Sequence, residues 1–263
     1  MKRLTLLQRF TVAALLLLAS GVAFDFAGSY ANCAAPESPW GARKKQLEEQ
    51  YRVDICFDVI GYPIRLLGGT FSTVPTHQRL KVLDALAIDL QAYDPAFLDS
   101  ALERIYIFDS LLLQGQWYGG TYDPWHKWVY IQTDWLGDDG TSRAGAGFHS
   151  ELSSILLWHH PDLFPLKAWS ELNPSDFTYQ RAVSSWENLR EGNTDYLGDE
   201  QLYAQGFLNG YGQNTLEDDM NGFAQYLAAK PDLLQELAAE YPAVRRKAEL
   251  LQGFYQALGF RSG

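Results

Sequence analysis

The residues most able to do chemistry lie in two short segments of the 263-residue chain. The first, 147–157, carries His149 and Glu151, and the second, 211–224, begins about 60 residues later and carries Glu217. Imidazoles and carboxylates are ligands that zinc uses, and a carboxylate beside a metal-bound water acts as a general base. The two segments therefore define a candidate metal or acid–base site.

Both segments are predicted to begin helices. Thr215 is a capping residue, and carboxylates in a first helical turn are favoured by the helix dipole. That preference alone also explains Glu151 and Glu217, so an ordinary structural role stays open for both. The first helix is indicated by apolar residues at i, i+4, i+7 and i+8, namely Phe148, Leu152, Ile155 and Leu156.

This order of elements resembles the gluzincin-type zinc metallopeptidases, most of all their lethal-factor-like and zinc-binding peptidase branches. In that family a mixed sheet ends in an edge strand, a helix bearing His-Glu-x-x-His follows, and a later helix donates a glutamate. The resemblance covers about residues 45–258 as an order of elements. It implies a general base at Glu151, a third zinc ligand at Glu217 and an oxyanion-steadying hydroxyl at Tyr211.

The motif departs from the family at its two histidine positions. Aligned on the glutamate, segment 150–154 (Ser-Glu-Leu-Ser-Ser) places Ser150 and Ser154 there. Neutral serine is a poor zinc ligand. Shifting the register by one residue supplies a single histidine, His149. If zinc binds, His149 and Glu217 are its expected ligands, but the family's ligand set is incomplete.

Three functions are compatible with these segments. The first is an exported metallopeptidase-like protein with impaired or lost zinc-dependent peptide hydrolysis and a retained groove for a peptide or protein ligand. The second is an active metal-dependent hydrolase with a non-standard site formed by His149, Glu151 and Glu217. The third is a secreted carbohydrate-binding or glycan-processing protein. Whether the protein is an enzyme stays open at this point.

An aromatic cluster, Trp117 to Trp135, supports the third alternative. Aromatic faces stack on sugars, and carboxylates such as Asp134 with Asp138 or Asp139 are a possible pair for glycoside hydrolysis. Aromatic residues are also common in strands, so the cluster equally fits sheet packing. In the metallopeptidase resemblance, the same segment is the edge strand that holds an extended ligand by β-augmentation.

The hydrophobic periodicity predicts an α+β fold, a small mixed sheet followed by a mainly helical C-terminal half, and the resemblance makes this fold metallopeptidase-like (zincin-like). Gly119-Gly120 is predicted to be a turn and 138–140 a loop. The predicted strands are 51–58, 105–113 and 128–133, and the predicted helices are 41–50, 76–93, 95–104, one from Phe148 onward, 215–229, 231–241 and 242–258.

The N-terminus is typical of a secretory signal peptide, predicted over 1–31 and followed by a single domain, 32–263. A basic start precedes the apolar run 10–23, which Asp25 ends. We therefore expect export to the periplasm or the extracellular space, with no membrane span after signal removal. Removal takes away three positive charges and one negative charge, so the formal charge changes from −11 to −13. Such an acidic protein is not expected to bind nucleic acid.

The two cysteines, Cys33 and Cys56, both follow the predicted signal segment. In an oxidising compartment they are able to form one disulfide, and two unpaired thiols are the alternative. The sequence contains neither a Gly-x-Ser-x-Gly elbow nor a phosphate-binding loop.

Overall fold

The computed structural model describes residues 33–61, 64–65, 67–113, 115–136, 146–179 and 197–260. The chain forms two compact units, Met1–Asn32 and Cys33–Gly263, and everything below concerns the second unit. The predicted signal segment lies outside the described residues, so its role in export stays a prediction. Among the helices that the structure describes, none combines the length and the hydrophobicity that a membrane span requires.

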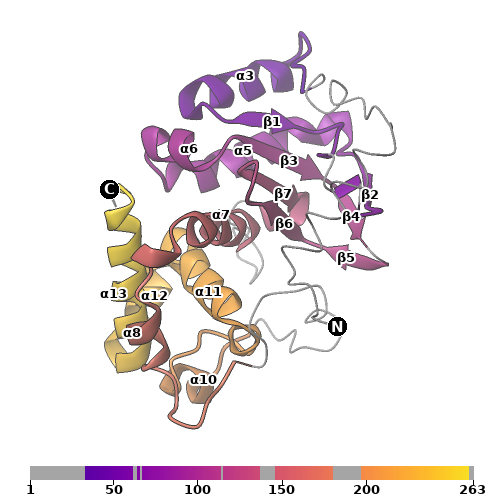
Figure 1. The fold of residues 1–263 in the computed structure, drawn as a ribbon. Coiled ribbons are helices and arrows are strands. Elements are labelled where there is room, and N and C mark those ends of the chain that lie inside the picture. Colours follow the sequence, from indigo (N-terminus) through magenta and orange to yellow (C-terminus); the bar gives the residue numbers. More distant parts are fainter. Residues whose placement is uncertain are drawn as a thin grey trace, which may run out of the picture. The chain divides into compact units, whose positions relative to one another are not determined.

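All strands of the described residues lie in the first part of the second unit, together with helices, and the second part is helical, which confirms the predicted α+β class (Figure 1). The first part contains α3 (Pro39–Tyr51), β1 (Asp54–Cys56), β2 (Thr70–Ser72), η1 (Thr76–Gln78), α5 (Arg79–Gln91), α6 (Pro95–Ala101), β3 (Arg104–Phe108), β4 (Ser110–Leu113), β5 (Gln116–Tyr118), β6 (Gly120–Asp123), β7 (Trp128–Gln132) and η2 (Thr133–Trp135). The later elements are α7 (Ala146–His159), η3 (Pro161–Leu163), α8 (Leu166–Ser170), α10 (Glu200–Ala204), η4 (Tyr211–Gln213), α11 (Leu216–Ala229), α12 (Pro231–Glu240) and α13 (Pro242–Ala257).

The main sheet is mixed, as predicted, and has the strand order β1-β3-β7-β6. Strands β1, β3 and β7 are parallel, whereas β6 pairs with β7 in the antiparallel sense and is an edge strand of the described sheet. A separate antiparallel sheet has the order β2-β4-β5. Helix α7 packs against β6 and β7 on one side and against α11 on the other (Figure 1).

Alternation along the central strands builds two cores, one on each face of the main sheet. Side chains of successive strand residues point to opposite faces. Ile105, Ile107, Val129 and Ile131 join the larger core, to which α7 contributes Phe148 and Leu152. Tyr106, Phe108, Trp128 and Tyr130 form the smaller core on the other face. Both faces are therefore covered, and the position of α7 against the sheet follows from its apolar side.

The structure corrects several expectations about local elements. The predicted strand 105–113 is two strands, β3 and β4, which belong to different sheets. Gly119-Gly120 is not a hairpin turn, because Gly120 begins β6. The first strand is shorter than predicted and is buried on both faces, since Cys56 is buried as well as Ile55.

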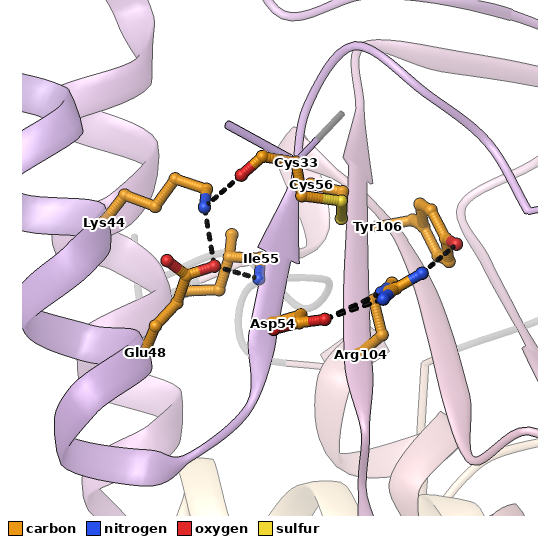
Figure 2. A network of polar contacts seen from close by, with 8 residues as sticks. All are labelled: Cys33, Lys44, Glu48, Asp54, Ile55, Cys56, Arg104 and Tyr106. Atoms are coloured by element: carbon orange, nitrogen blue, oxygen red, sulfur yellow. Dashed lines mark hydrogen bonds and ion pairs between the residues drawn. A yellow bond between two sulfur atoms is a disulfide. The ribbon is translucent and has the colours of Figure 1, made fainter. Parts of the chain in front are cut away.

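Cys33 and Cys56 form a disulfide, which decides between the two alternatives left open by the sequence. Figure 2 shows how the same region is held by hydrogen bonds: the Lys44 ammonium donates to the Cys33 carbonyl (2.6 Å) and to the Glu48 carboxylate (2.6 Å). Glu48 also accepts from the Ile55 backbone N–H (2.8 Å). The disulfide spans 23 residues, a loop for which a cross-link contributes about 3 kcal/mol.

Candidate functional site

The candidate site lies where α7, α11 and the edge strand β6 meet. Two hydrogen bonds between side chains set the register of α7 against α11. The Asn221 amide donates to the Ser154 hydroxyl (2.9 Å), and the Gln225 amide donates to the Ser150 hydroxyl. From Ser150 to Ser154 the residue number rises by four, whereas from the partner Gln225 to the partner Asn221 it falls by four. The two helices therefore run antiparallel along this seam. Ser150 and Ser154 are buried in it.

Glu151 and Glu217 converge beside this seam. Glu217 is hydrogen-bonded by the hydroxyls of Ser154 and Tyr122, the latter from β6. Glu151 packs on the same strand, where a Cβ added to Gly120 would lie 2.8 Å from the Glu151 carboxyl oxygen. A larger residue at this position would therefore meet the Glu151 carboxyl group, which would have to shift.

The carboxyl groups of this pair are surrounded by protein without being sealed from solvent, since both side chains keep intermediate exposure. Burial, and then the charges of Glu217 and Asp218, raise the pKa of Glu151 well above its usual value. Burial also raises the pKa of Glu217, but the hydrogen bonds from Ser154 and Tyr122 act in the opposite direction. The pKa of Glu151 is thus raised further than that of Glu217, so Glu151 keeps its proton to a higher pH than Glu217 does.

We expect the substitution Glu151→Gln to flatten part of the pH dependence of stability. The pKa of Glu151 is raised above 4.5, so the folded protein keeps a proton that the unfolded chain releases. This stabilisation is complete below that pH and is lost as the pH rises toward the folded pKa, at up to about 1.4 kcal/mol per pH unit. Glutamine has no such proton to lose. Urea unfolding at pH 5, 6, 7 and 8 measures the slope.

The control for this prediction is Glu49→Gln, an exposed position on α3 whose side chain is 69% accessible. It should keep the slope of the wild-type protein. Equal slopes for Glu151→Gln and the wild-type protein would contradict a protonated Glu151 in the folded state.

His149, although only two residues from Glu151, faces another part of the molecule. Its Nδ1 lies 2.8 Å from the Tyr93 hydroxyl, and its Nε2 lies 3.7 Å from a carboxyl oxygen of Asp89. The ring is 1% exposed, and burial lowers the pKa of His149 to about 3, so the imidazole is neutral. Residues two apart on a helix point in nearly opposite directions.

The structure therefore does not bring His149 and Glu217 together, and their expected role as two ligands of one zinc ion receives no support from these contacts. Within the described part of the chain, no group of three or more His, Cys, Asp or Glu residues is arranged to hold a metal ion. The groups that do meet at the pair are hydroxyls and carboxyls, and the two serines already accept amide hydrogen bonds from α11. This donor set does not fit zinc, which prefers imidazole and thiolate beside carboxylate.

A tyrosine with no predicted site role reaches the carboxyl pair. The hydroxyl of Tyr122, on the edge strand, is hydrogen-bonded to Glu217. Tyr211, the expected oxyanion residue, lies in η4 just before α11, and its role at the site stays a prediction. Tyr122 belongs to the aromatic cluster Trp117 to Trp135. The sequence did not predict which residue its hydroxyl contacts, because that contact depends on the pairing of β6 with β7. Asn221 and Gln225 were likewise missed, although their spacing of four residues places both on one helical face.

The aromatic cluster divides into buried and exposed members. Trp128 and Tyr130 pack inside the smaller core, so neither ring is accessible for stacking on a sugar. Trp117 and Trp125 are 67% and 68% exposed. Asp134 lies in η2, whereas Asp138 and Asp139 lie outside the described residues, as does the loop predicted at 138–140.

No protein-family model matches the sequence, and no curated protein matches it either. One solved structure that is similar is the crystal structure of "a putative zinc-binding metallo-peptidase" from Bacteroides caccae, at 13% sequence identity and a TM-score of 0.49. The similarity covers 86% of this chain and 89% of that chain.

Proposed function

We propose that the protein is an exported, metallopeptidase-like binding protein that holds an extended peptide or protein segment along β6 and has lost zinc-dependent hydrolysis. The observation that carries the proposal is the seam between α7 and α11. Ser150 and Ser154 lie at the positions where the family has zinc-binding imidazoles, and Gln225 and Asn221 hold their hydroxyls. The carboxyl pair is retained beside this seam while the two imidazole ligands are replaced.

The edge strand supports the binding part of the proposal. The Gln132 N–H donates to the Gly119 carbonyl (2.8 Å), directly opposite in the register of β6 and β7. Because hydrogen bonding alternates along an antiparallel pair, Thr121 also points its backbone groups toward β7. Gly120 and Tyr122 then direct theirs to the outer edge, where an extended segment is able to pair.

The proposal is tested first by metal content and hydrolysis. The purified mature chain is expected to contain less than stoichiometric zinc and to leave a mixed peptide pool uncleaved. Stoichiometric zinc that is lost in the variant His149→Ala would instead support the active hydrolase formed by His149, Glu151 and Glu217. Cleavage that depends on Glu151 would have the same meaning.

Binding is tested with random twelve-residue peptides displayed on phage and selected on the mature chain. A selected peptide is then synthesised in two forms, one with N-methyl groups on the odd-numbered residues and one with N-methyl groups on the even-numbered residues. One methylated form should no longer bind and the other should still bind, because only alternate backbone groups of an added strand face β6. Equal binding of the two methylated forms would argue against strand addition.

Carbohydrate binding is a second candidate, and one observation favours it. The exposed rings of Trp125 and Trp158 lie 5.5 Å apart in an edge-to-face arrangement. Trp158 is 52% exposed, so both rings present accessible faces of the kind that stack on sugars. Saturable binding on a glycan array that is lost in Trp125→Ala would support this candidate, whereas Trp128→Ala is not a suitable probe because Trp128 is buried.

A further inference from the structure

A cavity of about 400 Å³ lies at the C-terminal end of α7, away from the carboxyl pair. It is lined by residues of α6, the end of α7, η3 and the end of α13, and by Lys127 from the connection between β6 and β7, and it is partly open to solvent. The helices α6, α7 and α13 are labelled in Figure 1. His159 lines it and follows Glu151 by eight residues, about 12 Å along a helix axis. The volume is within the range of small-molecule sites.

The lining of this cavity combines basic and apolar groups, and none of the described residues in it is acidic. This composition contrasts with the whole chain, whose formal charge is −11. Lys127, His159 and His160 supply the basic groups. Burial, and then the charges of His159 and Lys127, lower the pKa of His160, as expected where basic groups converge.

Lys127 is held in place by its backbone and keeps donors for a ligand. Its φ of 53° is in the left-handed region, and its carbonyl accepts from the N–H groups of Glu103 (2.9 Å) and Arg104 (3.4 Å). The ammonium donates one hydrogen bond, to the Ser100 carbonyl (2.7 Å). An ammonium carries three N–H bonds, so two donors remain.

His159 acts as a positioning residue for the same connection. Its Nε2 lies 2.7 Å from the Pro124 carbonyl, which can only accept, so this nitrogen carries the proton. The contact fastens the segment that carries Lys127 to the end of α7. The apolar part of the lining, its floor, includes the buried side chains of Phe97, Ile155 and Leu156.

We propose that this cavity binds a small organic anion, a carboxylate on an apolar body, with Lys127 and His160 at the carboxylate and the apolar floor against the body. An aliphatic monocarboxylate and the C-terminus of a short apolar peptide share this chemistry. The site is independent of the carboxyl pair and of strand addition at β6.

The test is isothermal titration of the mature chain with decanoate and, separately, with N-acetyl-leucyl-phenylalanine. Acetate and 1-decanol serve as probes that lack the apolar body and the charge, respectively. Saturable 1:1 binding of either carboxylate, at least about tenfold tighter than acetate or decanol, is expected, since one charge-assisted contact typically contributes that much. Tighter binding of decanoate would indicate an aliphatic monocarboxylate as the ligand, and tighter binding of N-acetyl-leucyl-phenylalanine would indicate a peptide C-terminus. No binding of either at millimolar concentration, or equal binding of decanol, would overturn the proposal.

Variants locate the site. Lys127→Gly should weaken binding about tenfold or more without lowering the unfolding midpoint, because glycine adopts a φ of 53° without strain. Lys127→Met, which keeps an apolar stem, should weaken binding similarly. Lys167→Met, at a lysine on α8 whose side chain is 90% exposed, should leave binding unchanged. Unchanged affinity in both Lys127 variants would show that any binding takes place elsewhere.

Discussion

Replacing Asp219 with asparagine is expected to lower the free energy of unfolding by about 3–5 kcal/mol, the usual cost of leaving a buried charge without its partner. Asp219 lies 2.7 Å from the Lys247 ammonium, and both side chains are almost fully buried. The Asp219 carboxylate also accepts from the Trp169 indole (2.9 Å) and the Tyr179 hydroxyl (2.7 Å). Asparagine keeps the size of the side chain but not the charge that balances Lys247.

The surroundings of Lys247 explain why the loss should be large. Its ammonium lies over the ring of Phe207, 4.3 Å from the centroid, and no water-exposed surface remains on the residue. Burial lowers the pKa of Lys247, whereas the charge of Asp219 raises it. Without that carboxylate, the lysine must either stay charged in an aromatic environment or release its proton, and both cost free energy.

Denaturant unfolding followed by circular dichroism measures this prediction, with three comparisons. Lys247→Met should cost less than Asp219→Asn, because the remaining carboxyl group can take a proton and keeps two donors. The double variant should cost less than the sum of the single ones, since neither charge is then left alone. Lys45→Met breaks an exposed pair with Glu49 and should change stability by less than about 1 kcal/mol. A cost below 1 kcal/mol for Asp219→Asn would contradict the expected role of the pair.

Introducing histidines at Ser150 and Ser154 is expected to create zinc binding, with an affinity at least about 100-fold above that of the wild-type chain. The two positions are four residues apart on α7, so both imidazoles would lie on one face. Glu217 already contacts the Ser154 hydroxyl, which places a carboxylate beside them. Two imidazoles and a carboxylate are a common zinc ligand set, and a third ligand typically changes affinity by orders of magnitude.

Zinc affinity is measured by competition with a chelating dye, and circular dichroism reports whether the double variant folds. Adding Glu217→Gln should remove most of the gain, whereas adding His149→Asn should not, because His149 faces Tyr93 instead. Since Ser150 and Ser154 are buried, imidazoles at these positions test the packing as well. The substitution pair Ser150→Cys and Ser154→Cys is closer in volume and also supplies zinc ligands. A folded variant of either kind without improved zinc affinity would refute the proposed geometry of the site.

Both predictions involve a carboxylate in the first turn of α11, and the two carboxylates have different roles. Asp219 faces the helical core and stabilises the packing of α11 with α13 through Lys247. Glu217, two residues earlier, faces β6 and contacts Tyr122. The acidic start of α11 is therefore more than a dipole-favoured first turn, although the predicted cap by Thr215 is confirmed, with its hydroxyl accepting from the Asp218 N–H (3.0 Å).

Features that depend on local periodicity and on capping residues were predictable from the residue types and their spacing. The apolar repeat from Phe148 predicted α7, and the position of Glu151 and Glu217 on two successive site helices followed from the same patterns. The sequence also shows directly that positions 150 and 154 carry serine and not histidine. Such signals are local, because the spacing of residues along a helix decides which of them share a face.

Only the tertiary structure decided what each face meets. The sequence could not show that His149 points to Tyr93, because the rotation of α7 is set by its packing between the sheet and α11. For the same reason the sequence could not show that Tyr122 contacts Glu217, because this contact depends on the strand order that makes β6 an edge. The carboxyl pair thus arises from contacts between segments about 30 to 95 residues apart, which no local pattern records.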